Sequence, residues 1–128
     1  MNIEHIAFNV ADPVSMAEWY TGHLGMRVLR RVEGPAHTHF VADQAGRVVF
    51  ELYHNAKAGV PDYARMDPMV LHVAFTAADV AETRRRLLAA GATPVGDVGT
   101  NEAGDQLAMF RDPWGLAIQF VKRAQPMS

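Results

Sequence analysis

The chain of 128 residues contains no cysteine, which excludes both disulfide bonds and metal sites built on thiolates. It also lacks a strong excess of charge of either sign, since 12 Lys and Arg stand against 14 Asp and Glu. A net charge of −2 provides no basic surface for nucleic acid or an anionic membrane. No stretch approaches the roughly 20 apolar residues of a membrane span, and no charged leader precedes the first strand-like run. We therefore expect a cytoplasmic protein that binds neither nucleic acid nor membranes.

Two short phrases in the sequence place a histidine inside the same apolar pattern. Residues 4–8 read EHIAF and residues 71–75 read LHVAF, so His5 and His72 stand 67 positions apart. Hydrophobic side chains alternate around both histidines, which is typical of a strand with two differently used faces. A single histidine in a strand is usually a hydrogen-bonded core residue. Two at matching places indicate an internal repeat with a shared role.

The rest of the chain follows the same repeat. Each first strand, at residues 3–10 and 70–77, leads to a helix start at an aspartate N-cap. Asp12 is followed by Pro13, and Asp79 is followed by Glu82 in a D-x-x-E variant of the capping box. Three strand-like runs come after each helix, at about 26–33, 37–43 and 47–54 in the first half and 93–98, 105–111 and 116–122 in the second.

Each half therefore has the predicted order βαβββ. The first module covers about 2–54, the linker about 55–69 and the second module about 70–123. About 60 residues bury too little surface to hold a helix on a sheet alone. We therefore expect the modules to pack together, either within one chain or by exchange between the protomers of a homodimer.

Two further polar residues obey the repeat. Glu51 and Gln119 each interrupt the apolar pattern of the last strand of a half, and they are 68 positions apart. Imidazole and carboxylate ligands suit divalent first-row metals, and rigid strands favour a defined coordination geometry. Two neutral imidazoles, one carboxylate and one amide would leave such an ion with a net charge of +1. The other interpretations are structural histidines, a glutamate at a strand edge, and a glutamine that only forms hydrogen bonds.

The pattern resembles the vicinal oxygen chelate superfamily, which includes glyoxalase I, methylmalonyl-CoA epimerase, extradiol dioxygenases and the fosfomycin and bleomycin resistance proteins. The stretch RDPWGLAIQFV at residues 111–121 is similar to the closing D-P-x-G-x-x-I-E-L motif, with glutamine where glutamate is usual. The resemblance covers about residues 2–123. It implies an α+β fold whose two modules form an incomplete barrel around a central cavity with pseudo-two-fold symmetry, commonly in a homodimer. It also implies a metal ion held by His5, Glu51, His72 and Gln119.

The glutamine limits the chemistry that the resemblance implies. In glyoxalase-like enzymes a carboxylate bound to the metal moves a proton next to a carbonyl group. Because an amide cannot take up a proton near neutral pH, Glu51 would serve as both ligand and base. We therefore predict a lyase or isomerase that acts on a small carbonyl or vicinal-oxygen substrate. The metal is left open among Ni, Zn, Co, Mn and Fe.

Two other functions stay open. His5, His72 and Glu51 form the two-histidine, one-carboxylate set of non-haem Fe(II) oxygenases, which would suit an extradiol-type dioxygenase. A metal-free binding protein that sequesters a drug is the other alternative. For substrate contact we predict three residues near Glu51, namely His39, Tyr53 and His37.

Overall fold

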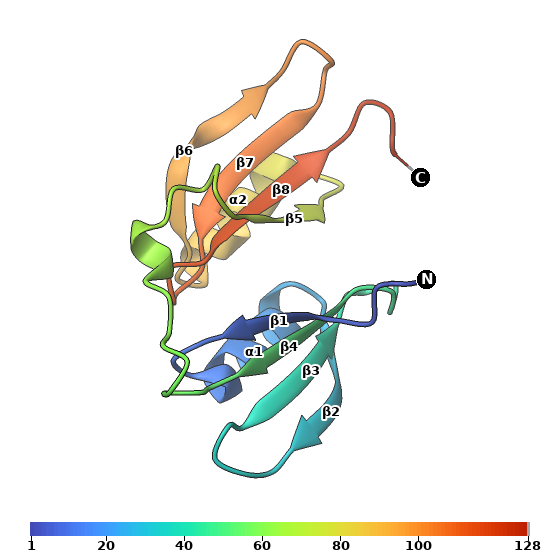
Figure 1. Cartoon of the computed structure of the whole chain (residues 1–128). Helices are drawn as coiled ribbons and strands as arrows, with labels where there is room; N and C mark the ends of the chain where they lie inside the picture. The colour runs from blue at the N-terminus through green and yellow to red at the C-terminus, as the bar shows by residue number, and fades with distance from the viewer. Residues whose placement is uncertain (128) are drawn as a thin grey trace. The chain divides into compact units, whose positions relative to one another are not determined.

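The computed structural model describes residues 1–127, which form two compact units, Met1–Pro61 and the chain from Asp62 onward. Each unit contains one four-stranded mixed sheet with one helix packed on it (Figure 1), so the predicted α+β fold with two βαβββ modules is confirmed. The first unit contains β1 (Ile6–Asn9), α1 (Pro13–His23), β2 (Arg27–Val32), β3 (Thr38–Ala42) and β4 (Val49–Tyr53). The second contains η1 (Tyr63–Arg65), β5 (Val73–Thr76), α2 (Val80–Ala89), β6 (Thr93–Thr100), β7 (Gln106–Arg111) and β8 (Ala117–Lys122). Within residues 1–127, no helix has the length and apolar character needed to cross a membrane.

The first and last strands of each unit are neighbours. The strand order is β1-β4-β3-β2 in one sheet and β5-β8-β7-β6 in the other, and the first pair in each is parallel. Ala7 lies beside Glu51 in the first sheet, and Ala74 lies beside Gln119 in the second. The two sheets therefore share one register as well as one topology, as the repeat in the sequence predicts.

Both helices begin at the predicted aspartates. The Asp12 side chain accepts a hydrogen bond from the Ser15 N–H at 3.0 Å, and Asp79 accepts one from the Glu82 N–H at 2.9 Å. Of the capping box expected at α2, only the bond to Asp79 forms, because the Glu82 carboxylate instead accepts a hydrogen bond from Arg85 Nε at 2.9 Å. A charged partner three residues along the helix offers this carboxylate a stronger bond than a backbone N–H.

The core of each unit lies between the helix and one face of its sheet. Met16 and Tyr20 of α1 are buried together with Leu52 of β4, each at most 1% exposed. In the second unit Leu87 of α2 and Ile118 of β8 have no exposed surface. Alternation along β4 and β8 then turns Glu51 and Gln119 to the face away from the helix, where both are only partly buried. Polar residues of the repeat thus share the sheet face that the core does not use.

The two histidines of the repeat stand just outside their strands. We expected strands over 3–10 and 70–77, but pairing begins at Ile6 with Phe50 and at Val73 with Ile118. Because β1 and β5 are edge strands of their sheets, each is paired on one side only. His5 and His72 therefore precede the first paired residue and have more freedom to orient their rings than a strand interior allows.

The turn between β7 and β8 is tightly hydrogen-bonded. One carboxylate oxygen of Asp112 accepts hydrogen bonds from the N–H groups of Trp114 and Leu116, both at 2.9 Å. Gly115 takes a φ of +92°, a conformation that suits glycine. A Cβ atom at this position would lie 2.7 Å from the backbone nitrogen of Ala64, so the turn also packs closely against η1.

This packing predicts that Gly115→Ala destabilises the protein more than Gly96→Ala does. Gly96 also has a positive φ, +74°, but a Cβ atom added there would have no heavy atom within 4 Å. Backbone strain alone should cost about 1 kcal/mol at Gly96. The added collision at Gly115 should raise the loss to about 2–4 kcal/mol. Urea denaturation of both variants measures the difference, and equal losses would show that the contact with Ala64 is unimportant.

Candidate metal centre

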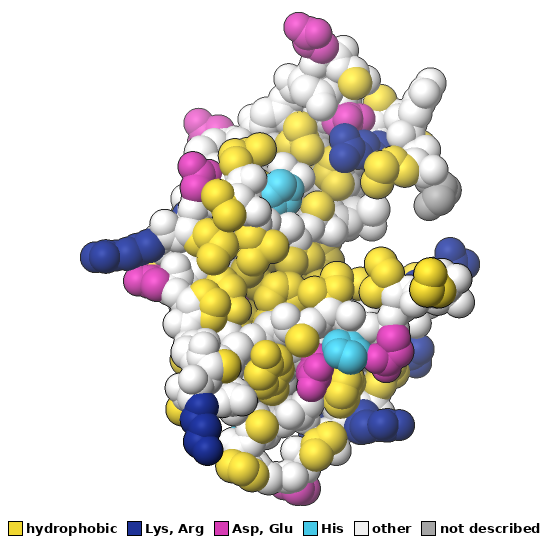
Figure 2. Space-filling view, viewed as in Figure 1, with side chains coloured by type: hydrophobic (Ala, Val, Ile, Leu, Met, Phe, Trp, Pro, Cys, Tyr) yellow, Lys and Arg dark blue, Asp and Glu magenta, His cyan; other side chains and the backbone are white. Residues whose placement is uncertain are grey.

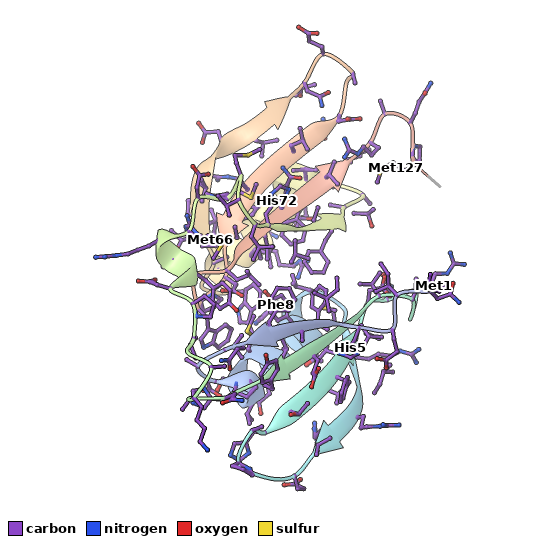
Figure 3. All side chains as sticks on the ribbon, in the orientation of Figure 1. Met1, His5, Phe8, Met66, His72 and Met127 are labelled. Atoms are coloured by element: carbon purple, nitrogen blue, oxygen red, sulfur yellow. The ribbon has the colours of Figure 1, made fainter. Side chains whose placement is uncertain are left out.

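In the first unit, the ring of His5 lies between two carboxylates. Its Nε2 atom is 3.0 Å from a carboxylate oxygen of Glu51, and its Nδ1 atom is hydrogen-bonded to the carboxylate of Glu4. The ring also meets Phe40 edge-on, with 5.8 Å between the ring centroids. Figure 2 shows a histidine of this unit flanked by acidic side chains, and Figure 3 labels it as His5. His5 and Glu51, two of the four predicted ligand residues, are thus in direct contact.

The two carboxylates make the surroundings of His5 favourable for positive charge. The hydrogen bond that His5 Nδ1–H donates to Glu4 is the main cause that raises the pKa of His5 above its ordinary value of 6.5. Partial burial opposes this increase, while the negative charges of Glu4 and Glu51 add to it. A group with a raised pKa holds its proton more tightly, and the same negative field would attract a metal cation to Nε2 once that proton leaves.

In the second unit, His72 is held by a backbone carbonyl instead of a carboxylate. Its Nδ1 atom is 2.8 Å from the carbonyl oxygen of Pro68. Because a carbonyl oxygen only accepts hydrogen bonds, Nδ1 carries the hydrogen and Nε2 of the neutral ring keeps its lone pair. Ala74, two residues after His72, pairs with Gln119 of β8. The Gln119 side chain is partly buried. His72 is labelled at the start of β5 in Figure 3.

These contacts fit a divalent metal. Histidines that bind metals almost always donate their second ring N–H to a carboxylate or a backbone carbonyl, which fixes the tautomer. His5 has the first kind of partner and His72 the second, so Nε2 is the ring nitrogen that would be offered to an ion in both. Within residues 1–127, no group of three or more His, Asp or Glu side chains is arranged to hold an ion. Each unit supplies two of the four predicted ligand positions.

Residues that pair side by side across a sheet form a row, and the row that contains Glu51 differs in chemical character from the row that contains Gln119. Across the first sheet, Glu51 lies beside Phe40, which lies beside the exposed Arg30. Across the second sheet, Gln119 lies beside Met109, which lies beside Val95. The first row thus combines a carboxylate, an aromatic ring and a cation, whereas the second is apolar apart from the amide. The two rows occupy equivalent positions in the repeat, but only the first contains charged side chains.

The structure separates His39 and His37 from Glu51, contrary to our expectation. His39 pairs with Leu52 in the register, so it faces α1 and is 8% exposed. Its Nδ1 donates to the carbonyl of His37 at 2.7 Å, and both histidines line a pocket of about 280 Å³ between α1 and strands β2 and β3. Tyr53, by contrast, shares the face of Glu51, two residues farther along β4.

Two partners in the site were missed by the sequence prediction. Glu4 is the residue directly before His5, and its charge in the phrase EHIAF was an available signal. The partner of His72 is the carbonyl of Pro68, a backbone atom four residues earlier. No side-chain pattern could have identified it.

Comparison with known proteins identifies the family of this chain. The sequence profile of the Glyoxalase/Bleomycin resistance protein/Dioxygenase superfamily matches residues 2–120. The chain belongs to this superfamily. The superfamily includes a relative from Vibrio cholerae named "Probable lactoylglutathione lyase", which is 29% identical over 129 residues, 96% of this chain and 91% of its own.

Solved structures with the same fold support this assignment of the fold. A glyoxalase family protein from Bacillus cereus is 20% identical, with a TM-score of 0.81 over 98% of this chain and 95% of its own. TnmS3, an antibiotic binding protein from Streptomyces sp. CB03234, is 22% identical, with a TM-score of 0.71 over 97% of this chain and 99% of its own. The resemblance found in the sequence is therefore confirmed for family and fold.

The contact between Glu4 and His5 predicts how His5 titrates in the metal-free protein. Its pKa should lie above 6.5, and Glu4→Gln should lower it toward that value because the principal hydrogen bond to a charged group is lost. Protonated His5 stabilises the fold fully below the unfolded-state pKa, and this contribution is lost as pH rises through the folded-state pKa. NMR titration measures the shift, with Glu102→Gln in the second unit as control. An unchanged titration in Glu4→Gln would contradict the assignment.

Proposed function

We propose that this protein is a metal-dependent lyase or isomerase of the glyoxalase type. The observation that carries the proposal is that both repeat histidines have Nδ1 hydrogen-bonded to an oxygen, which leaves Nε2 as a ligand atom. The ligands in this proposal are His5, Glu51, His72 and Gln119. When bound, the divalent ion supplies positive charge that stabilises the negative charge developing on two neighbouring substrate oxygens. Ni, Zn, Co, Mn and Fe all suit this donor set.

Glu51 is the base in this proposal. It is the one carboxylate among the four ligand positions, its side chain is 24% exposed, and a carboxylate oxygen lies 3.0 Å from His5 Nε2. Glu51 removes a proton from the carbon next to a carbonyl group and returns it to the neighbouring carbon, so one carboxylate serves both steps. Gln119 cannot exchange a proton near neutral pH. Its amide binds and orients without competing for the proton.

The substrate class follows from the relatives and from one cation. Relatives of this chain are named lactoylglutathione lyase, and glutathione carries carboxylates. Arg30 lies in the Glu51 row of the first sheet and is exposed, which supports it as the residue that binds such a carboxylate. We therefore propose a glutathione adduct of a small carbonyl compound as substrate.

Glu51→Gln should abolish turnover while the protein stays folded. The amide keeps the size of the side chain but cannot accept the proton, so turnover should fall by at least about 100-fold. The measurements are the rate at which the glutathione adduct is converted and the melting temperature, with Glu102→Gln as a control that changes the same groups on an exposed loop. Turnover at the unaltered rate in Glu51→Gln would exclude Glu51 as base.

Metal content of the purified protein separates the three candidate functions. Stoichiometric Ni, Zn, Co or Mn supports the lyase or isomerase. Fe(II) with uptake of oxygen on addition of substrate would favour the dioxygenase. Failure to bind any of these ions above the pH at which the histidines titrate would favour a metal-free binding protein.

We further propose that the protein is a homodimer, because ligand positions are divided equally between the two units. Mixing the inactive variants His5→Ala and His72→Ala tests which chains supply one site. If each site takes one unit from each protomer, mixed dimers regain one intact site, and about a quarter of all sites recover after subunit exchange. If both units come from one chain, no activity returns. Both interpretations assume that the protein is a dimer, which sedimentation measures. A monomer in that measurement would contradict the proposal of a homodimer.

A further inference from the structure

Arg111 makes an unusual set of contacts at the end of β7. Its Nη1 atom donates to the carbonyl oxygens of Tyr63 at 2.9 Å and Gly115 at 3.1 Å, and its Nη2 atom donates to that of Met66 at 2.9 Å. The guanidinium of a half-buried arginine thus binds three backbone carbonyls. Two of these belong to the segment that precedes β5. Arg111 therefore fastens this segment to the end of the sheet.

The fastened segment leads directly to His72. Met66 is followed by a turn over residues 67–70, closed by a hydrogen bond from Val70 N–H to the Asp67 carbonyl at 2.9 Å. The Asp67 side chain accepts a second bond from Met69 N–H, also at 2.9 Å. Pro68, whose ring fixes φ, is the second residue of this turn. Its carbonyl accepts the Nδ1 hydrogen of His72 (Figure 3 labels Met66 and His72).

The two units hold their histidines by different means. His5 is hydrogen-bonded to the side chain of Glu4, which is adjacent to it in the sequence. His72 depends on a carbonyl four residues away, so its orientation depends on the path of the backbone between them. A carbonyl in a loosely held turn would fix neither the ring nor its tautomer. The second unit therefore needs an additional anchor, and the hydrogen bonds of Arg111 provide it.

We propose that Arg111 is a positioning residue, which fixes the Nδ1–H tautomer of His72 through the 63–68 segment and the carbonyl of Pro68. This role rests on the proposed function, because it prepares Nε2 of His72 to bind a metal. The planar guanidinium is required, since its fixed fork of donors spans carbonyls on two sides. Lysine, with donors on one nitrogen, restores the effect only in part.

The test is the tautomer of His72 in the metal-free full chain. Long-range proton–nitrogen NMR above the histidine titration range distinguishes Nδ1–H from Nε2–H, and loss of the signal in His72→Asn assigns it. The wild-type protein should show the Nδ1–H form. Arg111→Met should show a mixture of both tautomers, and Arg111→Lys a smaller change. Zinc binding by Arg111→Met should weaken about tenfold, as for loss of other partners of metal ligands.

Two further variants keep the test independent of stability. Asp67→Ala loosens the same turn without altering Arg111 and should shift the tautomer in the same direction. Arg123→Met is the matched control, because Arg123 bonds to Asp105 at 2.8 Å and contributes to stability in the same unit. It should lower the melting temperature and leave the His72 tautomer unchanged.

The outcomes separate this inference from the proposed function. A single Nδ1–H tautomer and unchanged zinc affinity in Arg111→Met overturn the role of Arg111. A tautomer change in Arg123→Met equal to that in Arg111→Met overturns it as well, since the effect would then come from general loosening. If Arg111→Met changes the tautomer but wild type binds none of Ni, Zn, Co, Mn and Fe(II), the positioning by Arg111 is supported and the metal-dependent function is refuted.

Discussion

The candidate site depends on the parallel pairing of the first and last strands in each unit. Glu51 follows His5 by 46 residues in the chain, and the pairing of β1 with β4 brings Nε2 and a carboxylate oxygen within 3.0 Å. The pairing of β5 with β8 gives His72 and Gln119 the same offset in register. Because the helix covers one face of each sheet, the polar residues of the repeat lie on the other face. One topological feature, used twice, thus positions all four residues.

The two units use this shared frame for different chemistry. The first concentrates charge, with Glu4 and Glu51 on either side of His5 and Arg30 in the same row. The second offers a histidine held by a backbone carbonyl and an amide that lies beside Met109. Of the four predicted ligand positions, only Glu51 in the first unit is a carboxylate. The two units therefore place these residues at equivalent positions, but the residues themselves differ in charge.

Much of the fold was predictable because local signals agreed with the repeat. The caps at Asp12 and Asp79 and the order of helices and strands along the chain were predicted correctly. Alternation shows which residues of one strand share a face, but not which face of a neighbouring strand they join. His39 was therefore grouped with Glu51, whereas the register pairs it with Leu52 beneath α1. The contact of His72 with Pro68 depends on backbone geometry, which no residue pattern records.

The central claim is that one divalent ion is bound by residues from both repeats. A crystal structure of the metal-loaded protein, with anomalous scattering to identify the ion, tests this claim most directly. The account predicts an ion bonded to Nε2 of both histidines at about 2.0–2.1 Å, with oxygen ligands from Glu51 and Gln119. An ion bound only by residues of one unit, or bound at His37 and His39 in the pocket beneath α1, would contradict it.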